Sequence, residues 1–271
     1  MDDYLMGVMG DLNGLEALFY WLAERLHDAA AWPINLVRDL PRRVGRLLRL
    51  ALSGLKGLPH LLVELGQKKP NGWATWSKQW GRAFVFGTHQ LLCYLFDLIG
   101  GPELAQFFMH LVMPTTSLTV TEMGAVAQVL GPVALRFGEV RVAQGGILPF
   151  IFRRNGARAF ALWHTIHLPA RGREDLSLIV HEVTHIYQYE QIGSIYIGEA
   201  LHAQWTLGRG AYHYGGAEGL RQAHHSGKPY KAYTREQQAQ IAQDYYLLSC
   251  RQDNQTQHYT PYIQALQKGQ F

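Results

Sequence analysis

One apolar stretch, residues 176–189, constrains the fold of this 271-residue chain more than any other. It contains the pattern His-Glu-x-x-His, and the preceding Asp175 can cap a helix that begins there. Because His181 and His185 are four residues apart, a helix brings both imidazoles to one face, a single turn from each other. Two imidazole nitrogens at that spacing can bind one Zn²⁺. The stretch therefore predicts a helix that carries a metal site.

Glu182 directly follows the first histidine of the pattern. Its carboxylate is expected beside the metal, where it can take a proton from a water molecule. The alternative is a surface helix with solvated histidines, but Ile179 and Val180 favour burial. Burying two imidazoles and a carboxylate without partners would be costly. We therefore expect one Zn²⁺ per chain as cofactor, with His181 and His185 as ligands and Glu182 as the general base.

A catalytic zinc site takes three protein ligands and leaves one position open. The downstream candidates are two glutamates and four histidines: Glu199, Glu236, His202, His213, His224 and His225. We favour Glu236, because its predicted helix, residues 234–250, can dock beside the histidine helix and offers the small Ala239 for close contact. Glu199, on a predicted helix over residues 194–207, stays open as an alternative third ligand or as a group that orients one.

Hydrolysis of a peptide also needs a hydrogen-bond donor for the developing oxyanion. The nearest donors along the chain are Tyr212, His213 and Tyr214, in a loop that follows the second helix. Our candidate among them is Tyr214. The alternating run 159–168 predicts a strand, and its part around 163–168 could pair with an extended peptide substrate by edge addition.

The composition fits a folded protein rather than a disordered one, with 48% hydrophobic and 17% charged residues. The net charge is +4, and Lys and Arg are scattered after residue 70, so we expect no nucleic-acid partner. No run of about 18 uncharged apolar residues predicts a membrane span. The acidic start lacks the basic segment of a secretory signal. We expect the chain to be cytoplasmic at synthesis, and export by a dedicated secretion system remains compatible with this.

Residues 1–110 have the periodicity of helices. In the predicted helix from residue 36, apolar residues share one face, and Arg38, Arg42, Arg46 and Arg49 share the opposite face. These arginines could contact an anionic membrane or secretion machinery; the favoured alternative is a helix packed on its own domain with solvated arginines. Glycines and a proline at 54–59 predict the end of this helix, and turn residues predict a linker over 66–82.

The remaining pattern predicts a mainly helical α+β fold, with a small antiparallel sheet before the histidine helix. The expected β-like runs are 140–142, 147–152 and 159–168, and Asn155-Gly156 is a hairpin-turn signal. Thr119 and Glu122 form a capping-box pattern that predicts a helix through residue 129. We divide the chain into a helical region of unknown role, 1–110, and a catalytic domain, 111–271.

Three stretches of the chain resemble known proteins: 117–123 with 129–131, 180–189, and 236–241 with 244–246. The histidine helix and the later glutamate resemble the gluzincin metallopeptidases. All three stretches more closely resemble a group of bacterial zinc peptidases encoded near contractile-injection, Vgr and Rhs secretion loci. The resemblance covers about 115–250 and implies a zincin-like fold and hydrolysis of peptide or protein substrates. A different function for the same fold is a zinc-stabilised structural or delivery module of a secretion system, with little peptidase activity.

Overall fold

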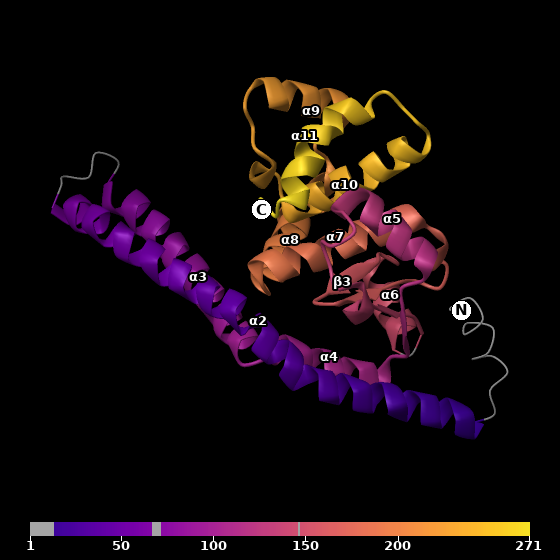
Figure 1. Cartoon of the computed structure of the whole chain (residues 1–271). Helices are drawn as coiled ribbons and strands as arrows, with labels where there is room; N and C mark the ends of the chain where they lie inside the picture. Colours follow the sequence, from indigo (N-terminus) through magenta and orange to yellow (C-terminus); the bar gives the residue numbers. More distant parts are fainter. Residues whose placement is uncertain (1–13, 67–71, 146) are drawn as a thin grey trace.

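The computed structural model describes residues 14–66, 72–145 and 147–271, and it has the mainly helical α+β architecture that the sequence predicts (Figure 1). A long arm of three helices runs along one side of a compact body. The arm contains α2 (Gly14–Gly66), α3 (Gly72–Leu98) and α4 (Gly101–Val112). The helices of the body are α5 (Val120–Leu130), α6 (Leu148–Asn155), α7 (Leu176–Ile192), α8 (Ile195–Leu207), α9 (Gly216–His225), α10 (Arg235–Cys250) and α11 (Thr256–Gln267).

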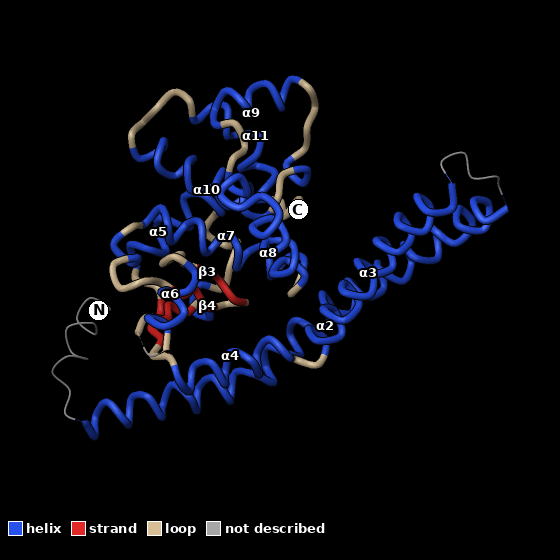
Figure 2. The backbone as a smooth tube through the Cα atoms, turned by 180° about the vertical axis from the view of Figure 1, so that it is seen from behind, coloured by secondary structure: helices blue, strands red, loops and turns tan. Residues whose placement is uncertain are grey.

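The arm is a helical hairpin in which α3 returns along α2 (Figure 2). The predicted end of the first helix near Gly54 and Pro59 is wrong, because α2 continues through these residues to Gly66. Intrinsic helix propensity is a weak preference that contact with another helix overrides, and α3 lies alongside here. The predicted linker is partly wrong too, since α3 begins at Gly72; residues 67–71 lie outside the described residues.

A four-stranded sheet lies between the arm and the helices of the body (Figure 2), with strand order β1-β2-β4-β3. Its strands are β1 (Thr115–Ser117), β2 (Arg141–Ala143), β3 (Phe160–Leu162) and β4 (Thr165–His167). Because β2 and β4 run parallel while the other pairs are antiparallel, the sheet is mixed, and our expectation of an antiparallel sheet needs this correction. β3 is an edge strand.

Two of the predicted β-like runs have other structures. Residues 147–152 belong largely to helix α6, whose first turn holds a proline and whose last residue is followed by Gly156 in the left-handed conformation (φ 75°). Asn155-Gly156 therefore ends a helix instead of joining two strands. The run 159–168 is a hairpin with a turn at Trp163 (φ 53°). A short hairpin and one longer strand have the same alternation in sequence, which explains the error.

The core of the body lies around α7, which packs between α5 and α10. The N-terminus of α5 has the predicted capping box, in which Thr119 and Glu122 exchange side-chain to backbone hydrogen bonds. Buried aliphatic side chains fill the space between these helices: Val126, Val129, Ile179, Val183, Ile186 and Ile241. Because residues 179–190 of α7 are all buried, this helix is a fixed support for the side chains that it carries.

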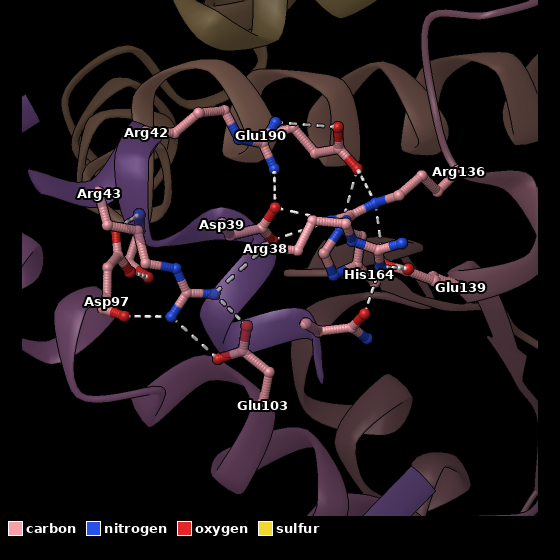
Figure 3. Close-up of polar contacts among 12 residues, drawn as sticks. Arg38, Asp39, Arg42, Arg43, Asp97, Glu103, Arg136, Glu139, His164 and Glu190 are labelled. Atoms are coloured by element: carbon pink, nitrogen blue, oxygen red, sulfur yellow. Dashed lines mark hydrogen bonds and ion pairs between the residues drawn. The ribbon is translucent and has the colours of Figure 1, made fainter. Parts of the chain in front are cut away.

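The arm contacts the body through charged side chains (Figure 3). Arg136 of the body forms an ion pair with Asp39 of α2, and Arg42 lies 3.4 Å from Glu190 of α7. Within the arm, Arg46 lies 3.3 Å from Asp97 of α3, and the carboxylate of Asp97 accepts a hydrogen bond from the backbone N–H of Ser194 in the body. The arm therefore packs on its own chain, as favoured above. Of the four predicted arginines only Arg46 is buried, whereas Arg38 and Arg42 are exposed but pair with carboxylates of the body, and Arg49 is exposed. The domain division near residue 110 falls at the end of α4 and stays a prediction.

Among the described residues, no single helix is long and apolar enough to cross a membrane. The pair Trp80–Leu98 and Gly101–Val112, bent by 71° at its break, meets the same length and composition criteria when the two helices are taken together.

Candidate metal centre

Helix α7 positions two of the predicted ligands. Its N-terminus is capped by Asp175, whose carboxylate accepts hydrogen bonds from the backbone N–H groups of Ser177 and Leu178, as predicted. The rings of His181 and His185 lie on one face of the helix, with centroids 5.1 Å apart, and both side chains are buried. The sequence spacing thus produces the expected pair of neighbouring imidazoles.

Helix α10 brings Glu236 to these histidines. The Oε2 atom of Glu236 lies 3.5 Å from Nε2 of His181 and 3.5 Å from Nε2 of His185. Ala239, one turn further along α10, is fully buried, and α10 packs against α7 along its length. The ligand atoms of the three residues all lie within 4.8 Å of one another, and among the described residues no other such group of histidine, cysteine or carboxylate ligands occurs.

Glutamine side chains fix the orientation of both imidazoles. Nδ1 of His181 lies 3.1 Å from Oε1 of Gln243, and Nδ1 of His185 lies 2.8 Å from Oε1 of Gln188. An amide oxygen only accepts hydrogen bonds, so each Nδ1 carries the proton and each Nε2 keeps its lone pair. The Nε2 atoms are the ones that face Glu236. Such outer hydrogen bonds are typical of histidines that bind a metal.

The two glutamines are themselves held in place. The amide of Gln188 donates to the backbone oxygen of Arg235 (3.1 Å) and to the side chain of Gln238 (3.0 Å). The amide of Gln243 donates to the hydroxyl of Ser177 (3.1 Å). The orientation of the histidines therefore depends on a continuous set of contacts between α7 and α10.

The electrostatics of the cluster favour a bound cation. Burial by itself raises the pKa of Glu236, but the imidazoles of His185 and His181 hold that pKa well below its ordinary value. Burial lowers the pKa of His185, yet the neighbouring Glu236 carboxylate outweighs it and raises the pKa to about 9. Burial raises the pKa of Glu182. The cluster thus attracts positive charge, which a proton supplies when no metal ion is bound.

The geometry of the donor atoms fits Zn²⁺. Tetrahedral coordination with bonds of about 2.0–2.1 Å places ligand atoms roughly 3.4 Å apart, close to the 3.5 Å between Glu236 and each imidazole. Glu182 lies next to this position, and its Oε2 atom is buried without a hydrogen-bond partner among the described residues. A buried carboxylate oxygen of this kind needs a partner, which a water molecule at the metal would provide.

A cavity of about 550 Å³ opens beside the cluster. The residues that line it include Glu182 and, from the edge strand β3, Phe160 and Leu162. Helix α8 contributes four apolar lining residues: Ile197, Ala200, Leu201 and Trp205. Tyr212, which follows α8, also lines the cavity. The lining of the cavity therefore combines a few polar groups with many apolar side chains, as small-molecule and peptide sites commonly do.

The alternative third ligand, Glu199, lies outside the cluster, because its carboxylate accepts a hydrogen bond from Nε of Arg235 at 2.5 Å. The predicted oxyanion donor needs a correction. The hydroxyl of Tyr214 bonds to the carboxylate of Asp244 and lies 2.8 Å from the hydroxyl of Tyr259, so it is held away from the metal ligands. Tyr212 lines the cavity in its place. The four histidines considered as third ligands are all exposed: His202, His213, His224 and His225.

Three glutamines of the site were not among the predicted residues. Besides Gln188 and Gln243, Gln204 of α8 donates a hydrogen bond of 2.7 Å to Oε1 of Glu236. A signal for two of them is present in the sequence: Gln188 follows His181 by seven residues, and Gln243 follows Glu236 by seven. Seven residues are close to two helical turns, so each glutamine shares a face with a ligand. Gln204 has no comparable signal.

Comparison with protein families gives one match. Residues 124–193, about a quarter of the chain, match the family model described as the eCIS core domain. Neither the curated proteins nor the solved structures that were searched include a match to the chain. The matched segment runs from α5 to the end of α7 and contains the His-Glu-x-x-His pattern, whereas Glu236 lies beyond it. Over this segment the chain is similar to the core domain of extracellular contractile injection systems, which links it to contractile-injection loci.

Proposed function

We propose that this chain is a zinc-dependent hydrolase of peptide bonds that works with a contractile injection system. One observation carries the proposal: a carboxylate from α10 lies equally close to both imidazoles of α7, with Glu182 beside them in the wall of an open cavity. A purely structural zinc site has no use for a neighbouring base, and structural sites are usually closed.

Each side chain of the site then has a role. His181, His185 and Glu236 would hold Zn²⁺, which when bound polarises water and the scissile carbonyl. Glu182 accepts the proton of the attacking water and returns it to the leaving amine. Tyr212 is our revised candidate for the donor to the oxyanion, since its ring lies 5.9 Å from that of His181.

The lining of the cavity suits an extended peptide as substrate. β3 is an edge strand, so its outer backbone groups can pair with an extended peptide. This replaces the predicted edge pairing through 163–168, because β4 lies inside the sheet between β2 and β3. The apolar walls formed by Phe160, Leu201 and Trp205 favour substrates with large apolar side chains next to the cleaved bond.

A second candidate is a zinc-stabilised delivery or structural module of the injection system. The family match favours it, because the matched segment carries the link to injection systems and ends before Glu236. In that function the zinc ion would join α7 to α10 and stabilise the body, and Glu182 would have no chemical task.

Digestion of a peptide library by the zinc-loaded full chain tests the proposal. We expect cleavage beside large apolar residues, and we expect Glu182→Gln to bind zinc normally but to lose about 10²–10⁴-fold in rate, because only the base is removed. Glu174→Gln is the matched control, since Glu174 is an exposed carboxylate near the start of the same helix. Stoichiometric zinc without any cleavage would favour the delivery module, and unchanged cleavage by Glu182→Gln would refute the role of the base.

A further inference from the structure

The arm has an inverted arrangement of polar and apolar side chains. On α2, the buried residues Asp39, Arg43 and Arg46 form one stripe toward the body. Val37, Val44 and Leu48 recur at spacings of seven and four, which places them on the opposite side of the helix, and all are exposed. A helix of a water-soluble protein normally orients these two faces the other way.

Helix α4 repeats the inversion. Its buried side chains Gln106 and His110 both bond to the hydroxyl of Thr165, at 2.9 Å each. Leu104, Phe108 and Leu111 occupy the opposite face and are exposed. The polar side of α4 thus contacts the sheet, while its apolar side points away from the body.

Charge is nearly absent from the outer surface of α4 and of α3 from residue 83 onward. Between residues 83 and 112 the sequence has two side chains of Asp, Glu, Lys or Arg, namely Asp97 and Glu103. Both are directed inward, where Arg46 pairs with Asp97 and Arg43 pairs with Glu103. Ionisable groups in contact with lipid are costly and are normally paired and turned inward in this manner.

The exposed apolar residues extend along the whole arm. They begin on α2, which has 53 residues and a length of about 80 Å, and continue onto α3 and α4. The α3–α4 pair also meets the length and composition criteria for membrane segments. A partner helix would cover a single stripe, whereas this surface involves three helices, and a lipid layer can cover all of them at once.

Exposed cations lie on the same arm. Arg49 and Lys56 flank the apolar stripe of α2, about a quarter turn from it, and Lys78 and Arg82 lie on α3; all four are exposed. Long basic side chains beside an apolar face suit anionic phospholipid headgroups, because the cation reaches the phosphate while its stem stays in the apolar layer.

We propose that the arm binds an anionic phospholipid bilayer, with the apolar faces of α2, α3 and α4 inserted into one leaflet. This is the reverse of a contact through the arginine face, because Arg42, Arg43 and Arg46 point toward other parts of the chain. The ion pair of Arg42 with Glu190 and the hydrogen bond from the backbone N–H of Ser194 to Asp97 connect the arm to both sides of the α7–α8 corner. Binding would therefore hold the candidate metal centre close to the membrane surface. The proposal does not depend on the hydrolytic function.

Flotation of the full chain with vesicles tests this proposal. We expect the protein to float with vesicles of phosphatidylcholine and phosphatidylglycerol, and less with phosphatidylcholine alone. The triple variant Val37→Glu/Val44→Glu/Leu48→Glu should lower the partition coefficient by roughly a hundredfold or more, because three side chains lose their apolar contact. Since the triple variant could fail to fold, Leu104→Ser/Phe108→Ser on α4 provides a second test, with circular dichroism and elution volume as controls for folding.

The matched control is Val120→Glu/Val133→Glu/Leu207→Glu, which places three new charges on exposed apolar residues of the body. It should float like the unmodified protein, and so should Glu182→Gln. The proposal is overturned if the unmodified protein stays with the lipid-free fraction, or if the arm variants float normally. It is also overturned if the unmodified protein self-associates and the triple variant does not. The apolar stripe of α2 would then be covered by a second copy of the chain instead of lipid.

Discussion

The body and the arm both bury charged side chains, but they do so in opposite ways. In the body, apolar side chains fill the interior around α7, and two of the buried carboxylates, Glu182 and Glu236, lie at the cavity. In the arm, the buried charges form the contact itself, and the apolar side chains remain outside. An amphipathic pattern therefore determines which residues share a face of a helix, while the surface that the helix meets determines which face is turned inward.

The two regions also differ in how charge is balanced. The ion pairs of the arm join arginines to carboxylates, so charges of opposite sign meet directly. The cluster of the body has two carboxylates, Glu182 and Glu236, beside two imidazoles that are neutral when a metal ion is bound. The raised pKa of His185 shows that this cluster gains from added positive charge. The arm thus balances its buried charges with side chains of its own chain, whereas the two carboxylates of the candidate site are not balanced by neutral imidazoles.

The largest predicted effect concerns the ion pairs of the arm. Arg46→Met leaves Asp97 without its arginine, although Ser194 still donates to its carboxylate through the backbone N–H at 3.0 Å. Removing one partner of a buried pair typically costs about 3–5 kcal/mol, so we expect a loss of this size in the free energy of unfolding. Urea denaturation followed by circular dichroism measures it.

Arg49→Met on the same helix is the control for that experiment. Arg49 is exposed, so its replacement should change the free energy of unfolding by no more than about 0.5 kcal/mol. Equal losses for the two variants would show that the charged contact of the arm does not stabilise the chain.

A smaller effect is predicted for the glutamines that orient the imidazoles. Gln243→Leu removes the acceptor for Nδ1–H of His181, so the ring loses its fixed orientation. We expect zinc affinity to fall by about 10–100-fold, as is typical when such an outer partner is lost. Gln240→Leu on the same helix should leave the affinity unchanged, because Gln240 bonds to Asp244 instead. Titration with a competing chelator distinguishes these outcomes.

Much of the body could be predicted from the sequence where local signals determine the structure. The caps at Thr119 and Asp175 begin helices in the structure as expected, and the helix predicted from residue 234 begins there with Thr234 as its cap. The spacing of His181 and His185 places them on one face, and the structure brings Glu236 to them. These features depend on helix geometry and on close packing between two helices, which short sequence patterns describe well.

The errors arise where tertiary contacts decide the outcome. The helix at 147–152 and the hairpin at 159–168 have apolar patterns that also suit a strand. Tyr214 lies close to Tyr212 in sequence, yet the contact with Asp244 of α10 directs its hydroxyl elsewhere. The orientation of α2 depends on carboxylates as far away in sequence as Glu190. None of these partners is visible within a local window of sequence.

Zinc titration of two matched variants tests the central claim, that α7 and α10 together form a metal centre. We predict that Glu236→Ala weakens zinc binding by more than about a hundredfold, because it removes the carboxylate that lies 3.5 Å from both imidazoles. Glu199→Ala should weaken it by no more than about 10–100-fold, because Glu199 touches the site only through Arg235. Competition with a chelator, followed at equal protein concentration, gives both affinities. The reverse ranking, or zinc binding that neither variant changes, would contradict the assignment of Glu236 as the third ligand.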